Sequence, residues 1–181
     1  MGAYFSLRAV KKTTLRHADN AWLFTEPKVT LHSGKLMAKA FAASFEGKAR
    51  EAVARTFTTS ILETYWHKIQ QSAAHDFALP EFFTAQVSAE LPNTALTLAR
   101  TMGEAAGDLD PLAASYLISV TYTAMLPDET RSRLGAYYTP PPLAERLVSM
   151  ATSAGVNWST CHVLDPACGG GAFLSAVARR W

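Results

Sequence analysis

The sequence predicts a mainly α-helical N-terminal module followed by the start of an α/β unit. Three observations support this prediction. Apolar residues recur every four positions from Val53 onward, an Asp-Pro pair marks a helix start at residue 110, and a short apolar segment near residue 163 runs into three consecutive glycines. With 181 residues, the chain is long enough to bury a genuine core.

The composition is that of a globular protein, because hydrophobic residues make up 49% of the chain and charged residues 18%. The net charge is only +2, which does not support a protein that coats nucleic acid. The first 60 residues hold ten Lys/Arg against four Asp/Glu. This basic segment could contact phosphates, but solvated helix faces give the same count and are the more frequent explanation.

Cysteine usage and hydropathy favour a cytoplasmic protein without a membrane anchor. Cys161 and Cys168 are too close together to form a disulfide scaffold, and no Cys or His spacing is typical of a metal site. No apolar run approaches the roughly 20 residues that span a bilayer, and the N-terminus lacks the apolar core of a secretory signal.

The N-terminal part divides into an arm and a helical module. Residues 1–32 show no sustained periodicity, so we expect an irregular arm, and from Ser33 to residue 126 we expect the helical module. Gly47 should separate a first short helix from a long one. The long helix carries an apolar stripe whose period of four is that of a buried helix face: Val53, Phe57, Ile61, Tyr65 and Ile69.

Two more helices are expected in the module. Residues 76–93 contain two prolines and should connect the long helix to one that passes through Leu96, Ala99 and Met102. Asp110 can accept hydrogen bonds from the free amides of a first helical turn, and Pro111 has no amide to leave unpaired. This pair predicts a helix over residues 111–126.

From residue 127 to 181 we expect a second unit. Asp128 should cap a short helix that ends at Gly135, and Thr139 should cap the next one, which Gly155 should end. The expected buried stripe of that helix consists of Leu143, Leu147, Met150 and Ala154. The segment "CHVLD", residues 161–165, reads as a compact apolar strand of a parallel sheet.

The glycine loop that follows predicts a ligand, because residues without a β-carbon let the backbone approach one closely. A phosphate-binding loop is excluded, since Ala172 follows Gly171 where Lys is required. A dinucleotide fingerprint is disfavoured, because Leu174 stands where it needs a third glycine. Asp165, at the end of the predicted strand, suits a ligand with a positive group, such as the ammonium of a methionine moiety, better than a pyrophosphate.

Two motifs together resemble one enzyme family. "VLDPACGGGAFL" is similar to the S-adenosylmethionine motif of gamma-type adenine-N6 DNA methyltransferases of restriction-modification systems, D-P-[AT]-[CA]-G-[ST]-G-x-F-L. Upstream, "GAYYTPP" resembles the companion motif of that family, G-x-[YF]-[YF]-T-P. The resemblance covers residues 116–181 and implies that the second unit is the start of a Rossmann-like, S-adenosylmethionine-dependent methyltransferase domain, truncated after its first strand and helix.

The resemblance also implies a set of cofactor-binding residues. The methionine end of S-adenosylmethionine would lie against the companion motif, and its amino-acid and ribose portions against the glycine loop, with an aromatic residue shaping the pocket wall. Carried over to this sequence, the residues are Ala136, Tyr137, Tyr138, Thr139, Pro140 and Pro141, then Asp165, Pro166, Ala167, Cys168, Gly169 and Gly171, and finally Phe173.

Some positions have a second interpretation. Tyr137 and Tyr138 could be core aromatics, and Thr139 could be a helix cap without a ligand. Cys168 could be a nucleophile, as in cytosine methyltransferases, but it lies inside the cofactor turn and we interpret it as a semi-buried packing residue. Gly170 departs from the family, which has Ser or Thr there.

The family's catalytic motif, [ND]-P-P-[YFW], does not occur in the sequence, so no catalytic residue is assigned. We therefore expect the front end of a methyltransferase that is inactive alone. The family implies double-stranded DNA as the partner of the intact enzyme. The missing C-terminal part, or a specificity or restriction subunit, could complete this chain. The alternative is a non-catalytic helical interaction module, or a remnant, that binds a partner subunit.

Overall fold

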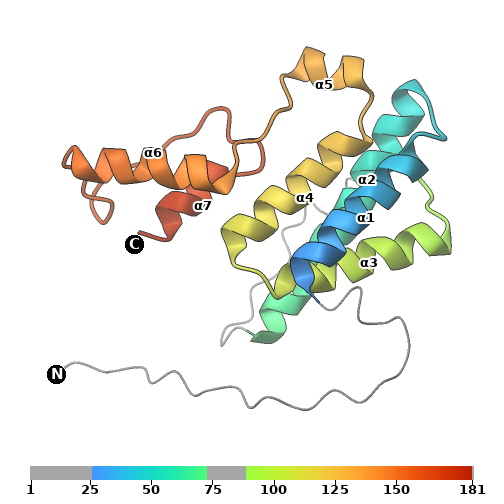
Figure 1. Cartoon of the computed structure of the whole chain (residues 1–181), viewed down its shortest axis with the longest axis horizontal. Coiled ribbons are helices and arrows are strands. Elements are labelled where there is room, and N and C mark those ends of the chain that lie inside the picture. Colours follow the sequence, from blue (N-terminus) through green and yellow to red (C-terminus); the bar gives the residue numbers. More distant parts are fainter. Residues whose placement is uncertain (1–25, 73–88, 181) are drawn as a thin grey trace.

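The computed structural model describes residues 26–72 and 89–180, and this part of the chain is mainly helical. No helix in it is both long enough and apolar enough to cross a membrane. In the described residues, helices α1 to α4 cluster together, α5 lies above them in the view of Figure 1, and α6 and α7 lie to their left. The helices are α1 (Pro27–Ala42), α2 (Gly47–Ser72), α3 (Asn93–Gly107), α4 (Pro111–Met125), α5 (Asp128–Leu134), α6 (Pro141–Ser153) and α7 (Ala172–Ala178).

Helices α1 to α4 enclose the larger hydrophobic core. Val53, Phe57 and Ile61 of the predicted stripe are buried in it, and Tyr65 packs against it partly buried. Ile69, the last residue of the predicted stripe, is half-buried and is not part of this core. The helices approach closely where side chains are small: a β-carbon on Gly34 of α1 would lie 2.6 Å from the sulfur of Met102 on α3. The expected helical module is therefore a packed four-helix core.

The predicted N-terminal arm extends too far along the chain. Helix α1 already begins at Pro27, and Leu31 within it is only 1% exposed. Proline at the first helical position fixes φ and has no amide to lose, which favours a helix start there. Residues 1–25, and most of the predicted connection between α2 and α3, lie outside the described residues.

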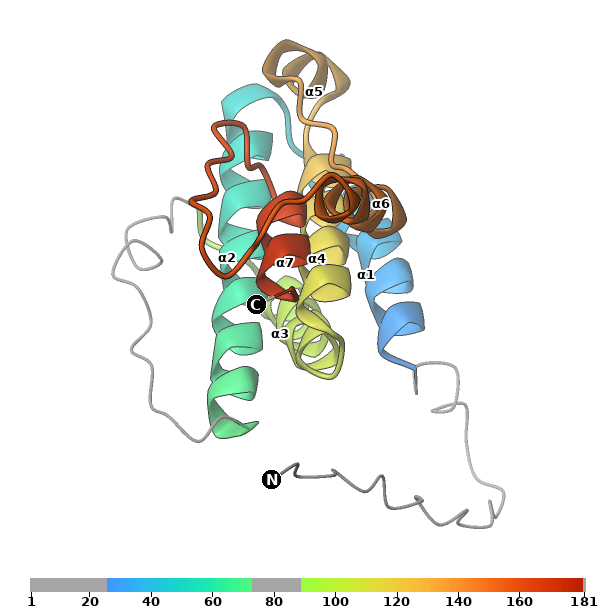
Figure 2. The ribbon, with the colours of Figure 1, turned by 90° about the vertical axis from the view of Figure 1, so that its left-hand side faces the viewer.

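Helix α4 starts as predicted and joins two cores. The Asp110 carboxylate accepts hydrogen bonds from the amides of Leu112 and Ala113, at 3.1 and 3.3 Å. Ile118 belongs to the four-helix core, whereas Leu112 belongs to a smaller core with α6 and α7. In Figure 2, α6 and α7 lie beside α4. Because α4 packs on both sides, it connects the helical module to the segment that carries the two motifs.

Two predicted helix caps are not formed. Asp128 is the first residue of α5 rather than its cap, and its carboxylate pairs with Arg131 at 2.6 Å. Thr139 precedes the extended Pro140, which holds the N-cap position of α6 without a side-chain hydrogen bond. The C-terminal stop of α5 is confirmed, because Gly135 adopts φ +58°, a left-handed conformation that favours glycine.

The predicted buried stripe of α6 is wrong. Leu143, Leu147 and Met150 are 51%, 42% and 53% exposed, and Ala154 is exposed as well. Instead, Ala144 and Val148 are buried against Ala176 and Val177 of α7. Their small side chains let the short helix α7 pack closely, and the face with the larger residues therefore turns to solvent.

The predicted strand at residues 161–165 is not formed, and the described part of the chain contains no strand and no start of a parallel sheet. Leu164 is 87% exposed and Val163 41%. A strand is defined by hydrogen bonds to a neighbouring strand, and no described segment offers such a neighbour. The apolar composition alone therefore does not produce a strand.

Candidate functional site

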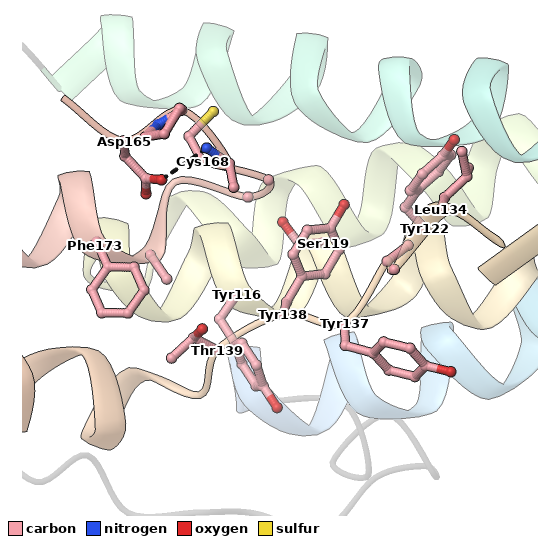
Figure 3. Close-up of a pocket in the computed structure, with 17 residues that line it drawn as sticks. Tyr116, Ser119, Tyr122, Leu134, Tyr137, Tyr138, Thr139, Asp165, Cys168 and Phe173 are labelled. Carbon is pink, nitrogen blue, oxygen red and sulfur yellow. Dashed lines mark hydrogen bonds between the residues drawn. The ribbon is translucent and has the colours of Figure 1, made fainter. Parts of the chain in front are cut away.

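One pocket of about 680 Å³ brings both motif segments together (Figure 3). The segment between α5 and α6 forms one side, the glycine loop before α7 forms another, and α4 forms the third. The lining residues are Tyr116, Ser119, Tyr122, Leu134, Gly135, Ala136, Tyr137, Tyr138, Thr139, Asp165, Pro166, Ala167, Cys168, Gly169, Gly170, Ala172 and Phe173. Thr139 and Asp165, which are 26 positions apart in the sequence, therefore face the same space.

The glycine loop is a tight turn that needs glycine at two positions. Gly169 has φ +50° and Gly171 φ +74°, both in the left-handed region where a β-carbon is strained. The Gly171 amide donates to the Cys168 carbonyl at 2.6 Å, which closes the turn. At its start, the Asp165 carboxylate accepts a hydrogen bond from the Ala167 amide at 3.1 Å. Asp165 is thus fixed by one oxygen at the entry to the loop.

Tyr138 lies against this loop. A β-carbon on Gly169 would come within 2.7 Å of the Tyr138 ring, so glycine at this position lets the ring approach. Partial burial raises the pKa of the Tyr138 hydroxyl, and the nearby Tyr122 hydroxyl and Cys168 thiol raise it further. At neutral pH this hydroxyl is therefore protonated and can donate a hydrogen bond into the pocket.

Three predicted site residues do not line the pocket: Pro140, Pro141 and Gly171. Tyr137 lines it only marginally, because 70% of the residue is exposed and its ring points away from the loop (Figure 3). Cys168 is an exposed free thiol and not the semi-buried packing residue that we expected. Phe173 lies at the pocket wall and also packs against the smaller core.

Helix α4 contributes three pocket residues that the sequence reasoning missed: Tyr116, Ser119 and Tyr122. Their spacing of three residues places them on one helix face. A row of hydroxyl-bearing side chains on an otherwise apolar helix was the available signal. Leu134, Gly135, Gly170 and Ala172 complete the set of lining residues that were not predicted.

Among the described residues that line the pocket, Asp165 is the only Asp, Glu, Lys, Arg or His. Four tyrosines and one phenylalanine are also among these lining residues. Within the described residues, no group of three or more His, Cys, Asp or Glu side chains could hold a metal ion. This arrangement suits a ligand that combines a positive group with flat or apolar parts.

Comparisons with known proteins return nothing: no family model, no curated protein and no solved structure matches this chain.

Proposed function

We propose that this pocket is part of a binding site for S-adenosylmethionine, and that the chain is the N-terminal part of an adenine-N6 DNA methyltransferase of a restriction-modification system. The observation that carries the proposal is the convergence of two motifs. The segment around Thr139 and the loop after Asp165 are separated by helix α6, yet they line the same pocket. This convergence supports the interpretation of the two motifs as parts of one site.

The residues present fit the charges of the cofactor. Asp165 uses its Oδ1 atom for the Ala167 amide, which leaves Oδ2 available for an ammonium group. None of the described residues that line the pocket is cationic, so they offer a phosphate ligand no counter-charge. The faces of Tyr138 and Tyr116 can attract a sulfonium cation through their π-electrons.

The proposed reaction transfers the methyl group of S-adenosylmethionine to the exocyclic nitrogen of adenine in double-stranded DNA. In the family that the sequence resembles, this step uses an [ND]-P-P-[YFW] motif, which the sequence lacks. This chain would therefore bind the cofactor only in part, and a further polypeptide segment or a specificity or restriction subunit would supply the adenine-binding residues.

Calorimetry with S-adenosylmethionine tests the proposal directly. We expect weak binding by the wild-type chain and a loss of about tenfold or more in Asp165→Asn, because the ionic hydrogen bond to the ammonium is replaced by a neutral one. Asp128→Asn is the matched control, since Asp128 lies on α5 outside the pocket. ATP should not bind. Equal affinities for ATP and S-adenosylmethionine would contradict the proposal.

A second assay concerns activity. With tritiated S-adenosylmethionine and adenine-containing duplex DNA, we expect no methyl transfer by this chain alone. Adding a polypeptide that carries an N-P-P-[YF] segment should restore transfer. Methyl transfer by the isolated chain would show that the missing motif is not needed.

A non-catalytic interaction module is the second candidate, and one observation favours it. Leu143, Leu147 and Met150 form an exposed apolar row on α6, and Leu164 is also exposed. A module of this kind would bind a partner subunit through that row without any need for the cofactor. Replacing Leu143 and Leu147 by Ser should then abolish binding to the partner and leave S-adenosylmethionine affinity unchanged.

A further inference from the structure

We infer that Ser115 and Ser119 of helix α4 are positioning residues that hold the glycine loop, and that Ser119 restricts position 170 to glycine. The inference deepens the proposed function, and the expected effect of these serines on S-adenosylmethionine binding rests on that function. The helical module would then help to shape the pocket, because α4 belongs to the four-helix core and also contacts the glycine loop.

A hydrogen bond connects helix α4 to the glycine loop. The Ser115 hydroxyl donates to the carbonyl oxygen of Gly170, 55 residues further along the chain. Ser115 lies between Ala114 and Ile118, both buried in the four-helix core, and the helix start is fixed by the Asp110 cap. The donor is therefore held on a rigid element, whereas the acceptor belongs to a loop without regular secondary structure.

Steric contact with α4 explains the glycine at position 170. Gly169 and Gly171 need glycine for their left-handed backbone, but the φ of Gly170 lies outside that region. The backbone there would accept a side chain, and the family that the sequence resembles has Ser or Thr. In this protein a β-carbon on Gly170 would lie 2.8 Å from the Ser119 β-carbon and would also collide with the Ser119 hydroxyl.

The contact with the Ser119 β-carbon determines which movement can relieve the collision of a side chain at position 170. Rotating the Ser119 hydroxyl moves the oxygen away but leaves the β-carbon in place, so the loop or the helix must shift to admit a side chain at position 170. The ring of Tyr138 lies against the neighbouring residue, Gly169. The loop is thus held between α4 and Tyr138, and a shift of the loop changes the pocket that both line.

Amide hydrogen exchange of Gly171 and Ser175, whose amides donate to the carbonyls of Cys168 and Gly171, tests the inference without a ligand. Gly170→Ala should speed exchange of these amides by about tenfold or more, the effect expected of an overpacked contact. Adding Ser119→Gly, which removes the β-carbon, should restore slow exchange. Adding Ser119→Ala, which keeps it, should not. Equal rescue by Ser119→Gly and Ser119→Ala, or no effect of Gly170→Ala, would overturn the inference.

The hydrogen bond has its own test. Ser115→Ala should speed exchange in the same loop and leave the exchange of α2 unchanged. Ser153→Ala is the matched control, because the Ser153 hydroxyl also donates to a carbonyl, that of Ser149, but on α6 away from the loop. If Ser115→Ala leaves the loop as protected as Ser153→Ala does, the hydrogen bond does not position the loop.

Titration with S-adenosylmethionine links the loop to the proposed function. The affinity should fall in Gly170→Ala, recover in Gly170→Ala/Ser119→Gly and stay low in Gly170→Ala/Ser119→Ala. If the wild-type chain binds no S-adenosylmethionine but the exchange pattern holds, the proposed function fails and the positioning by α4 stands. If the affinity for S-adenosylmethionine is the same in all these variants, the position of the loop does not determine cofactor binding.

Discussion

Replacing Gly169 by alanine should damage the loop for two separable reasons. The backbone at this position has φ +50°, which strains any residue with a β-carbon. The new methyl group would also lie 2.7 Å from one carbon of the Tyr138 ring and 3.1 Å from the next, so the ring has to move. The substitution therefore combines a conformational cost with a collision.

The two costs have different magnitudes. A left-handed conformation costs an alanine about 1–2 kcal/mol relative to glycine. Overpacking against a ring adds about 1–3 kcal/mol more. Gly47 separates the terms, because it has the same φ of +50° but no atom within 4 Å of its β-carbon position. Gly47→Ala should therefore lose only the first amount, and Gly169→Ala both.

Urea unfolding followed by circular dichroism measures the free energies, and amide exchange of α7 reports any local opening that global unfolding misses. In a Tyr138→Ala background the ring is gone, so Gly169→Ala should then cost no more than Gly47→Ala. If Gly169→Ala and Gly47→Ala differ by less than about 0.5 kcal/mol in the wild-type background, Tyr138 does not pack on the loop.

Three further outcomes are expected. Phe57→Ala should cost about 3–5 kcal/mol in urea unfolding, because the side chain is fully buried, whereas Leu36→Ala, at a residue 56% exposed, should cost about 0.5 kcal/mol or less. Asp110→Ala should cost about 1 kcal/mol by removing the α4 cap, and Asp110→Asn should retain most of the stability; equal losses would argue against the cap. Burial raises the pKa of the Tyr138 and Tyr65 hydroxyls, and the charge of Asp110 raises that of Tyr65 further. Absorbance titration should therefore find both hydroxyls ionising above pH 10.0. The free energy of unfolding should fall as the pH rises through this range, because the folded state binds these protons more tightly than the unfolded state does. A Tyr138→Phe variant should lose less stability at alkaline pH than the wild type does.

The alkaline effect has a definite sign. A raised pKa in the folded state means that the unfolded tyrosine ionises first. Below the unfolded value of 10.0 both states are protonated and the shift has no effect on stability. As the pH rises above it, the unfolded state is favoured progressively until the folded hydroxyl also ionises.

The candidate site was predictable only in part. The loop from Asp165 to Gly169 and the segment from Ala136 to Thr139 could be found as motifs, since each is contiguous in the sequence. The row of hydroxyl-bearing side chains on α4 was a signal for a polar face, but its contact with the loop could not be predicted, because Ser119 and Gly170 are 51 positions apart and no local pattern indicates that they touch. The two motifs predict the ligand class that we propose. Which helix completes the pocket depends on packing between residues that are far apart in the sequence.

The same division runs through the fold. The sequence by itself determined the features that depend on near neighbours: the Asp110 cap of α4 and the left-handed stop at Gly135. These interactions involve groups within about four residues, so the chain can form them wherever it goes.

Only the tertiary structure decided which surfaces are covered. Leu143 and Leu164 are as apolar as the buried Val148, yet they face solvent. Helix α7 packs against the smaller side chains of α6, and no strand within residues 26–72 and 89–180 pairs with residues 161–165. Burial and strand pairing each need a partner surface from elsewhere in the chain. Hydrophobic composition predicts that a residue can be buried, and the fold alone determines whether anything covers it.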